Sequence, residues 1–117
     1  MGIVIKATID LAPGTRTEVL REAARLIADA RAEAGCRAYD WSADPDLADR
    51  VHVFEEWESP EALAAHFRAP SFMGILELLG RFGIVGSDAR KYRFDAVEPV
   101  YGPDGTPSAR FADEGAG

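Results

Sequence analysis

The hydrophobic residues near the N-terminus recur at every second position, from Ile3 to Leu11. This alternation predicts a strand with one face in the core. After a Pro–Gly turn, apolar residues recur every three or four positions from about Thr15, and the pattern stops at Gly35. It predicts an amphipathic helix that ends at a glycine. Residues 36–43 and 50–58 are rich in aromatic and β-branched side chains and predict two further strands.

Two short helices are expected after the third strand. Ser59 can cap a helix, and Pro60 suits the first helical position because its missing N–H would have no partner there. Pro70 interrupts this helix and starts another. Residues 89–97 alternate again and predict a fourth strand. The order β-α-β-β-α-β, with the second helix broken in two, indicates an α+β, ferredoxin-like fold with a four-stranded antiparallel sheet.

The length of 117 residues fits one domain. We expect residues 1–98 to form this domain. Residues 99–117 are rich in proline, glycine, alanine and aspartate and have few apolar side chains with which to dock. They predict a C-terminal extension that is either flexible or lies as an arm across a partner subunit.

Aromatic side chains in the strands predict association. Strand faces that look away from the helices still hold large residues, and an open aromatic sheet face is an association site. The candidates are Tyr39, Trp41, Phe54, Tyr92 and Phe94. A homodimer in which two sheets close on each other would cover them. The alternative is that the C-terminal extension covers some of these rings.

Charge and composition narrow the function classes. The net charge of −7 argues against nucleic acid as a partner. No apolar run approaches the length of a membrane span and no signal peptide pattern occurs, so we expect a cytoplasmic protein without membrane contact. Cys36 is the only cysteine, which excludes an internal disulfide. Two histidines without metal-binding spacing, and no glycine-rich phosphate loop, predict that the protein has no metal or nucleotide cofactor.

His66 is the leading chemical candidate. It lies at helical spacing from Leu63 and Phe67, on the face that looks inward. An imidazole can accept a phenolic proton near neutral pH. The alternative is a structural histidine that ties the helix to a strand through one hydrogen bond. Trp57 also has two possible roles: it is either a core residue or an indole N–H donor for a substrate oxygen.

Other polar residues near this stretch have simpler interpretations. His52 alternates with valines on a strand and has no carboxylate partner that the sequence identifies. Three glutamates cluster around Trp57, but neighbours on a strand point to opposite faces. We interpret Glu55, Glu56 and Glu58 as a solvated edge or as salt-bridge partners for Arg50 or Arg68.

A set of short motifs resembles the antibiotic biosynthesis monooxygenase family over about residues 3–97. The motifs are Pro13-Gly14, Gly35 to Tyr39, Glu56-Trp57-Glu58-Ser59, Ala62-Leu63, Ala65-His66-Phe67 and Pro70. The resemblance implies a small dimeric α/β-barrel protein. The family includes quinol monooxygenases, anthrone oxygenases, haem-degrading enzymes and proteins of no known activity.

Residues that differ from those of each branch of the family limit which activity the resemblance implies. The positions of the haem-degrading branch's Asn, Trp and His ligand hold Ala7, His66 and Leu76, so we expect no haem. Anthrone oxygenases have an Asn where this chain has Val53. Quinol monooxygenases match best, because their Tyr, Trp and His recur here as Tyr39, Trp57 and His66. Their second His is replaced by Ser71.

The resemblance implies a cofactor-independent monooxygenase that acts on a small electron-rich aromatic substrate, such as a quinol, an anthrone or a polyketide, with molecular oxygen as co-substrate. His66 would be the base. The residues expected to bind the substrate are Tyr39, Phe54, Trp57, Leu63, Phe67, Phe72, Met73, Leu76 and Tyr92. Two alternatives remain open: a non-oxidative isomerase, cyclase or lyase on the same scaffold, and a non-catalytic ligand-binding dimer of the stress-response type.

Overall fold

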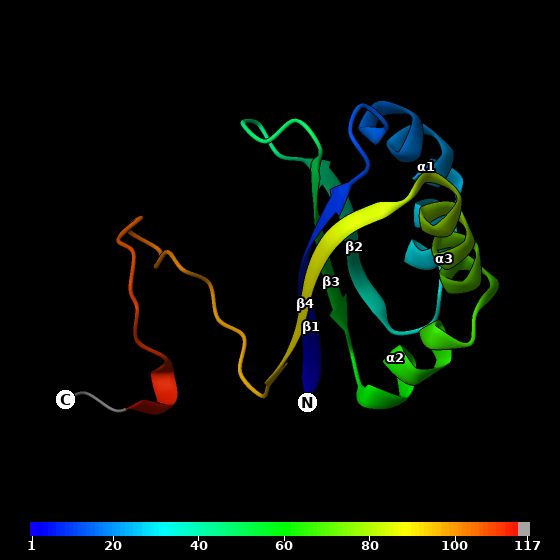
Figure 1. Ribbon diagram of the computed structural model, residues 1–117. Helices are drawn as coiled ribbons and strands as arrows, with labels where there is room; N and C mark the ends of the chain where they lie inside the picture. Colours follow the sequence, from blue (N-terminus) through cyan, green and yellow to red (C-terminus); the bar gives the residue numbers. More distant parts are fainter. Residues whose placement is uncertain (115–117) are drawn as a thin grey trace.

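The four predicted strands and three helices occur in the predicted order. In the computed structural model, which describes residues 1–114, the elements are β1 (Gly2–Leu11), α1 (Arg16–Arg31), β2 (Cys36–Ala43), β3 (Arg50–Trp57), α2 (Pro60–Phe67), α3 (Pro70–Phe82), β4 (Ile84–Phe94) and a 3₁₀ turn, η1 (Ala112–Glu114). The strands form one antiparallel sheet in the order β2-β3-β1-β4. All three main helices cover the same face of this sheet (Figure 1). The ferredoxin-like α+β fold is therefore confirmed.

The core lies between the sheet and the helices, where the apolar stripes of both meet. On β1 every fourth residue is fully buried, namely Ile3, Ala7 and Leu11. The buried stripe of α1 is Val19, Ala23, Ile27 and Ala30. α3 buries Ile75, Leu78 and Leu79 on the same side. The alternating apolar residues of the strands and the helically spaced apolar residues of the helices thus pack together in one core.

The break between α2 and α3 forms as the sequence predicts. The Ser59 hydroxyl accepts a hydrogen bond from the backbone N–H of Ala62 at 3.1 Å and caps α2. Pro60 and Pro70 each occupy the first position of a helix. Because α2 is only two turns long and buries Leu63 and His66, it presents the imidazole to the interior.

The fourth strand is longer and starts earlier than predicted. It runs over residues 84–94 and not 89–97, and it pairs along all of β1, from Leu11 opposite Ile84 to Gly2 opposite Phe94. Gly83, with φ of 95°, turns the chain directly from α3 into this strand. β4 ends at Phe94, opposite Gly2, the first residue of β1.

The aromatic residues of the strands lie on both faces of the sheet, and a bulge in β2 changes which of them face the helices. A bulge between Cys36 and Ala38 shifts the register of β2. As a result Tyr39 and Trp41 face the helices, opposite Glu55 and Val53. The open face keeps Phe54 from β3 together with Tyr92 and Phe94 from β4.

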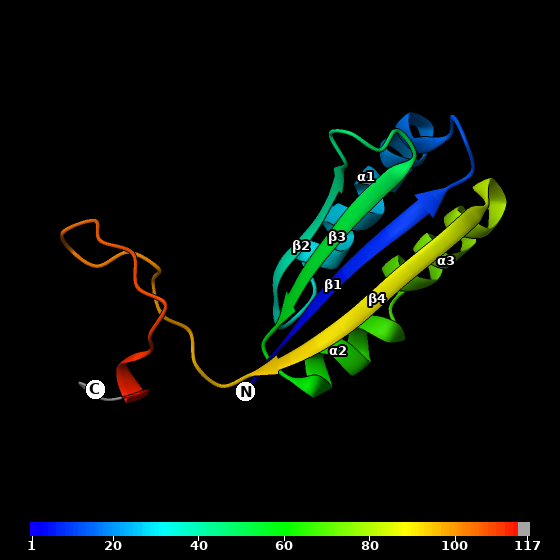
Figure 2. The same ribbon diagram turned by 60° about the vertical axis from the view of Figure 1, so that its left-hand side comes forward.

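The C-terminal residues leave the sheet on the side opposite the helices (Figures 1 and 2). We call residues 95–114 the arm. The predicted extension comprised residues 99–117, of which residues 115–117 lie outside the described part of the chain.

Candidate functional site

His66 lies at the centre of a buried aromatic cluster. Its side chain is only 1% exposed. The imidazole centroid is 4.6 Å from the Trp57 ring, 5.5 Å from Tyr39 and 5.5 Å from Phe72. Phe67 packs against Phe72 at 5.1 Å. Three elements, β2, β3 and the α2–α3 pair, thus bring the predicted Tyr39, Trp57 and His66 together.

A carboxylate orients the His66 ring. The Nδ1 atom of His66 lies 2.7 Å from Oε1 of Glu33, in the turn between α1 and β2. The other carboxylate oxygen of Glu33 accepts a hydrogen bond from the Ser71 hydroxyl at the start of α3. Because an ionised carboxylate can only accept, Nδ1 carries a proton and donates it to Glu33, which in the neutral ring leaves the lone pair on Nε2. The ring is therefore held in the tautomer that can act as a base.

Sequence reasoning missed both partners of this arrangement. In the sequence, Ser71 stands where the quinol monooxygenases have a second histidine, and Glu33 belongs to the polar face of an amphipathic pattern. Glu33 is 33 residues from His66, and the two meet only because α1 and α2 cover the same sheet face. No local spacing signals such a contact.

A second carboxyl group is buried beside the cluster. Glu55 is only 9% exposed and accepts a hydrogen bond from the Trp57 indole N–H at 2.9 Å. Burial raises the pKa of Glu55, although the Trp57 hydrogen bond lowers it. The interpretation of Glu55 as a solvated edge residue is therefore wrong. It failed because β3 turns Glu55 to the helix side and leaves Glu56 on the other.

The Trp57–Glu55 bond changes the role of the indole. Its N–H is already used within the protein, so it is not a free donor for a substrate oxygen. Two other donors share this side of β2. Burial raises the pKa of the Tyr39 hydroxyl, which stays protonated. The Trp41 indole N–H is buried near that hydroxyl, yet it has no hydrogen-bond partner of normal geometry among the described residues.

The remaining predicted binding residues separate into two groups. Leu63, Phe67 and Phe72 surround or adjoin His66. Phe54 and Tyr92 do not, because they lie on the open face of the sheet, and Met73 and Leu76 point outward from α3 and are about half exposed. These four residues therefore do not join the His66 cluster in the described chain, because the register of the sheet and the face of α3 place them elsewhere, and their role in substrate binding stays a prediction.

A hollow adjoins the cluster at the bulge of β2. A hollow of about 270 Å³ is lined there by Arg31, Cys36, Arg37, Ala38, Tyr39 and Asp40. Tyr39 lies both at this hollow and against the His66 ring. His66 itself is enclosed.

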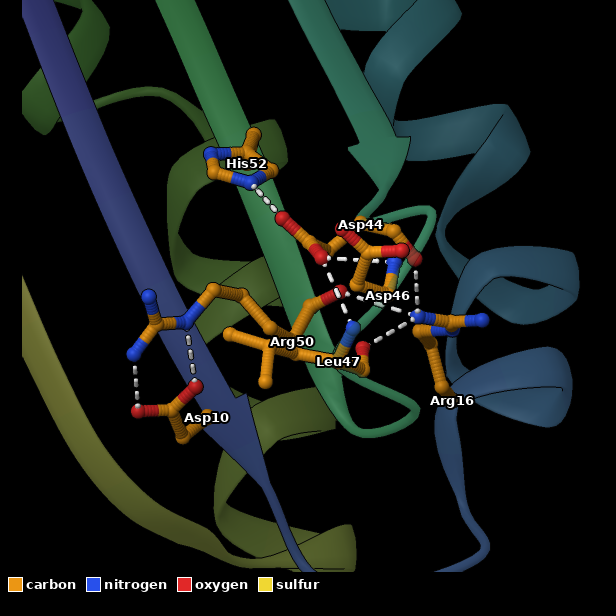
Figure 3. Close-up of polar contacts among 7 residues, drawn as sticks. All are labelled: Asp10, Arg16, Asp44, Asp46, Leu47, Arg50 and His52. Carbon is orange, nitrogen blue, oxygen red and sulfur yellow. Dashed lines mark hydrogen bonds and ion pairs between the residues drawn. The ribbon is translucent and has the colours of Figure 1, made fainter.

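The second histidine belongs to a structural cluster at the far end of the open face (Figure 3). His52 Nε2 lies 2.6 Å from a carboxylate oxygen of Asp44, a partner that the sequence did not reveal. This contact is the largest cause that lowers the pKa of Asp44. Arg50 pairs with Asp10 at 2.8 Å, and Arg16 donates to three carbonyl groups of the β2–β3 loop. The cluster holds this loop against α1.

Within residues 1–114, no group of three or more His, Cys, Asp or Glu side chains is arranged to hold a metal ion. No helix in that range is long and apolar enough to cross a bilayer.

A test of the buried Glu55 follows from the direction of its pKa. Because the folded state raises this pKa, the protein binds the proton more readily than the unfolded chain does. The resulting stabilisation is complete below the unfolded value of about 4.5 and is lost as the pH rises through the folded pKa. Glu55→Gln keeps an acceptor for Trp57 and cannot ionise. We expect it to increase the free energy of unfolding at pH 7.5, on the order of 1 kcal/mol, with no gain at pH 4.

Urea unfolding followed by circular dichroism at both pH values measures this difference. Glu77→Gln, at an exposed position of α3, is the matched control and should change stability little at either pH. A Glu55→Gln protein that is less stable than the wild type at pH 7.5 would show that the ionised carboxylate is needed.

Known proteins share this architecture. A provisionally named antibiotic biosynthesis monooxygenase from Deinococcus radiodurans superposes with a TM-score of 0.76 at 16% identity, over 86% of this chain and 99% of that one. PA3566 from Pseudomonas aeruginosa gives 0.72 at 27% identity, over 81% and 95%. Rv0793 from Mycobacterium tuberculosis gives 0.72 at 22%, over 84% and 100%. Comparison with curated proteins gives no match.

The sequence itself gives the family. Residues 2–77 match the family described as antibiotic biosynthesis monooxygenase, and this segment contains β1 to β3, α2 and most of α3. It also contains His66, Glu33, Ser71, Glu55 and Trp57. The chain therefore belongs to the antibiotic biosynthesis monooxygenase family.

Proposed function

We propose that the protein is a cofactor-independent monooxygenase that acts on a small electron-rich aromatic substrate of the quinol, anthrone or polyketide type. The observation that carries this proposal is the His66 imidazole, enclosed by aromatic rings and oriented through Nδ1 by Glu33. The rings around His66 offer apolar surface on which an aromatic substrate could stack if they move apart, and in the neutral imidazole the hydrogen bond from Nδ1 to the carboxylate leaves Nε2 as the proton acceptor.

The chemistry follows from the deprotonated substrate. Transfer of a proton to His66 Nε2 leaves an electron-rich anion, which can reduce O₂ without a metal or flavin. For an anthrone, the ring CH₂ becomes C=O, one atom of O₂ enters the product and the other leaves as water with the two hydrogens removed. Tyr39 and Trp41 supply neutral donors that can hold a substrate oxygen. Exclusion of water protects the reactive intermediate.

Oxygen uptake with a panel of quinols and anthrones tests this proposal, with and without a chelator. We expect consumption of one O₂ per substrate, unaffected by the chelator, and one labelled oxygen atom per product when ¹⁸O₂ is supplied. Conversion that continues without oxygen would contradict it. So would binding without conversion, which would favour the non-catalytic ligand-binding alternative.

One observation favours a second candidate, a non-oxidative isomerase, cyclase or lyase. The site holds a buried carboxyl group with a raised pKa, Glu55, on the same sheet face as the Glu33-oriented imidazole. An acid with a raised pKa and a base on the same sheet face can move a proton between two positions of one substrate. Anaerobic turnover separates this reaction from the monooxygenase.

We also propose that the protein is a homodimer with its open sheet faces in contact. Proteins of this family are typically dimeric. In this chain the open face exposes 43% of Phe54 and 49% of Tyr92, which favours burial against a second copy. Light scattering at micromolar concentration should give about 25 kDa, twice the 12.7 kDa of one chain. A mass of one chain would contradict the dimer.

A further inference from the structure

The arm, residues 95–114, has a defined shape but does not pack on its own domain. Among residues 1–114, the hydrogen bonds of the arm join its own residues: Tyr101 bridges to Pro107, Ser108 N donates to Val100 O at 2.9 Å, and the Glu98 carboxylate accepts from Ala112 N at 2.9 Å. These contacts fold the arm onto itself. Figures 1 and 2 show it projecting away from the sheet face that the helices leave open.

The overall dimensions show how far the arm projects. The radius of gyration is 16.8 Å, whereas a compact domain of this length has about 13 Å. The apolar side chains of the arm are correspondingly uncovered. Val97 is 73% exposed, Tyr101 64% and Phe111 39%. A segment with a fixed shape and exposed apolar side chains suits docking on another surface.

The receiving surface lies on the open sheet face. A hollow of about 390 Å³ separates the sheet from the arm. The sheet contributes Val4, Glu56, Tyr92 and Phe94 to its walls, and residues 96–98 with Phe111 supply the rest. One chain thus carries both an apolar donor segment and an apolar receiving patch, and its own arm leaves that patch open. This is the arrangement that a two-fold pair of identical chains can satisfy reciprocally.

The arm and β4 carry opposite net charge, which favours contact between the arm of one chain and β4 of another. The arm has five acidic residues, Asp95, Glu98, Asp104, Asp113 and Glu114, against one arginine, Arg110. β4 has the opposite balance, with Arg90, Lys91 and Arg93 against Asp88. Arg90 lies on the open face and pairs with Asp88. Lys91 and Arg93 lie opposite Ile5 and Ile3, on the helix side of this strand, where they are exposed and form no ion pair within residues 1–114. β4 is also an edge strand, so it is accessible to a second chain.

We propose that the arm of each chain docks on the open sheet face and β4 of a second copy, in an exchanged arrangement. This inference rests on the proposed homodimer and adds to it. The arm lies outside residues 2–77, the part that matches the family, so it supplies a contact that the matched segment does not contain. The partner is a second copy of this chain, because one chain carries both the apolar donor segment and the apolar receiving patch, and two copies can satisfy both reciprocally.

A photo-crosslink in the full-length protein tests the exchange. Phe111 is replaced by p-benzoylphenylalanine, and the protein is mixed with ¹⁵N-labelled wild type until native mass spectrometry shows mixed dimers. We expect crosslinked peptides that join an unlabelled arm to labelled β1, β3 or β4. Crosslinks confined to one chain, or no crosslink from a dimeric protein, would overturn the exchange and leave the dimer intact. A monomeric wild type would overturn both.

Affinity gives a second measurement. Tyr101→Ser combined with Phe111→Ser should raise the dimer dissociation constant at least tenfold in sedimentation equilibrium, because buried aromatic anchors dominate interface energetics. Leu47→Ser removes an apolar side chain that is 50% exposed in the β2–β3 loop and should leave the constant unchanged. An unchanged constant for the double variant would contradict docking of the arm on the partner.

Discussion

Replacing His66 by asparagine is expected to lower kcat/KM by roughly 10²-fold or more, the usual contribution of a general base. Asparagine tests the base more specifically than alanine does, because its amide nitrogen lies near the position of Nδ1 and can still donate to Glu33. The acceptor at Nε2 is lost. The acidic limb of the kcat/KM profile should also disappear, since no group remains that must be deprotonated for the reaction.

The structural alternative for His66 makes the opposite prediction. If its hydrogen bond to Glu33 only ties α2 to the turn before β2, His66→Asn keeps activity per folded molecule, and His66→Leu lowers the melting temperature. Glu33→Gln is the matched second variant. It keeps an oxygen that can accept from Nδ1 but removes the carboxylate charge, and we expect it to reduce kcat/KM by less than His66→Asn does, with the pH profile shifted.

Replacing Trp57 by alanine is expected to reduce the free energy of unfolding by about 3–5 kcal/mol, the usual cost of truncating a large buried aromatic residue. Trp57 is fully buried and packs on the His66 ring. For a domain of this size such a loss is a large part of the total stability. Urea unfolding followed by circular dichroism measures it.

Phenylalanine substitutions separate packing from hydrogen bonding at the two tryptophans. Trp57→Phe keeps a ring but leaves the buried Glu55 carboxyl without its donor, so we expect a loss of about 1–3 kcal/mol. Trp41→Phe is the control. Its indole N–H has no partner in the described chain, so its removal should change stability much less. Equal losses for both substitutions would show that the Trp57–Glu55 bond contributes nothing measurable.

The positions of two carboxyl groups near His66, those of Glu55 and Glu33, could not be predicted from the sequence. Glu55 is one of three glutamates around Trp57, a composition typical of a solvated edge. It is buried because β3 turns its side chain toward the helices. Glu33 lies near the end of a helix with an ordinary amphipathic pattern. Its role depends on the crossing of α1 and α2 over one sheet face. Both contacts are products of packing, and neither leaves a periodic signal.

The sequence by itself determined the order of the elements, the break between α2 and α3 at Pro70, the inward position of His66 and the family. These features depend on local chemistry: alternation, helical spacing, caps and the restricted backbone of proline. Only the tertiary structure decided which face of the sheet each aromatic residue occupies. The bulge at Cys36 turns Tyr39 inward, and the pairing of β4 along β1 places Tyr92 outside. Register is set by long-range pairing, and a shift of one residue reverses every face.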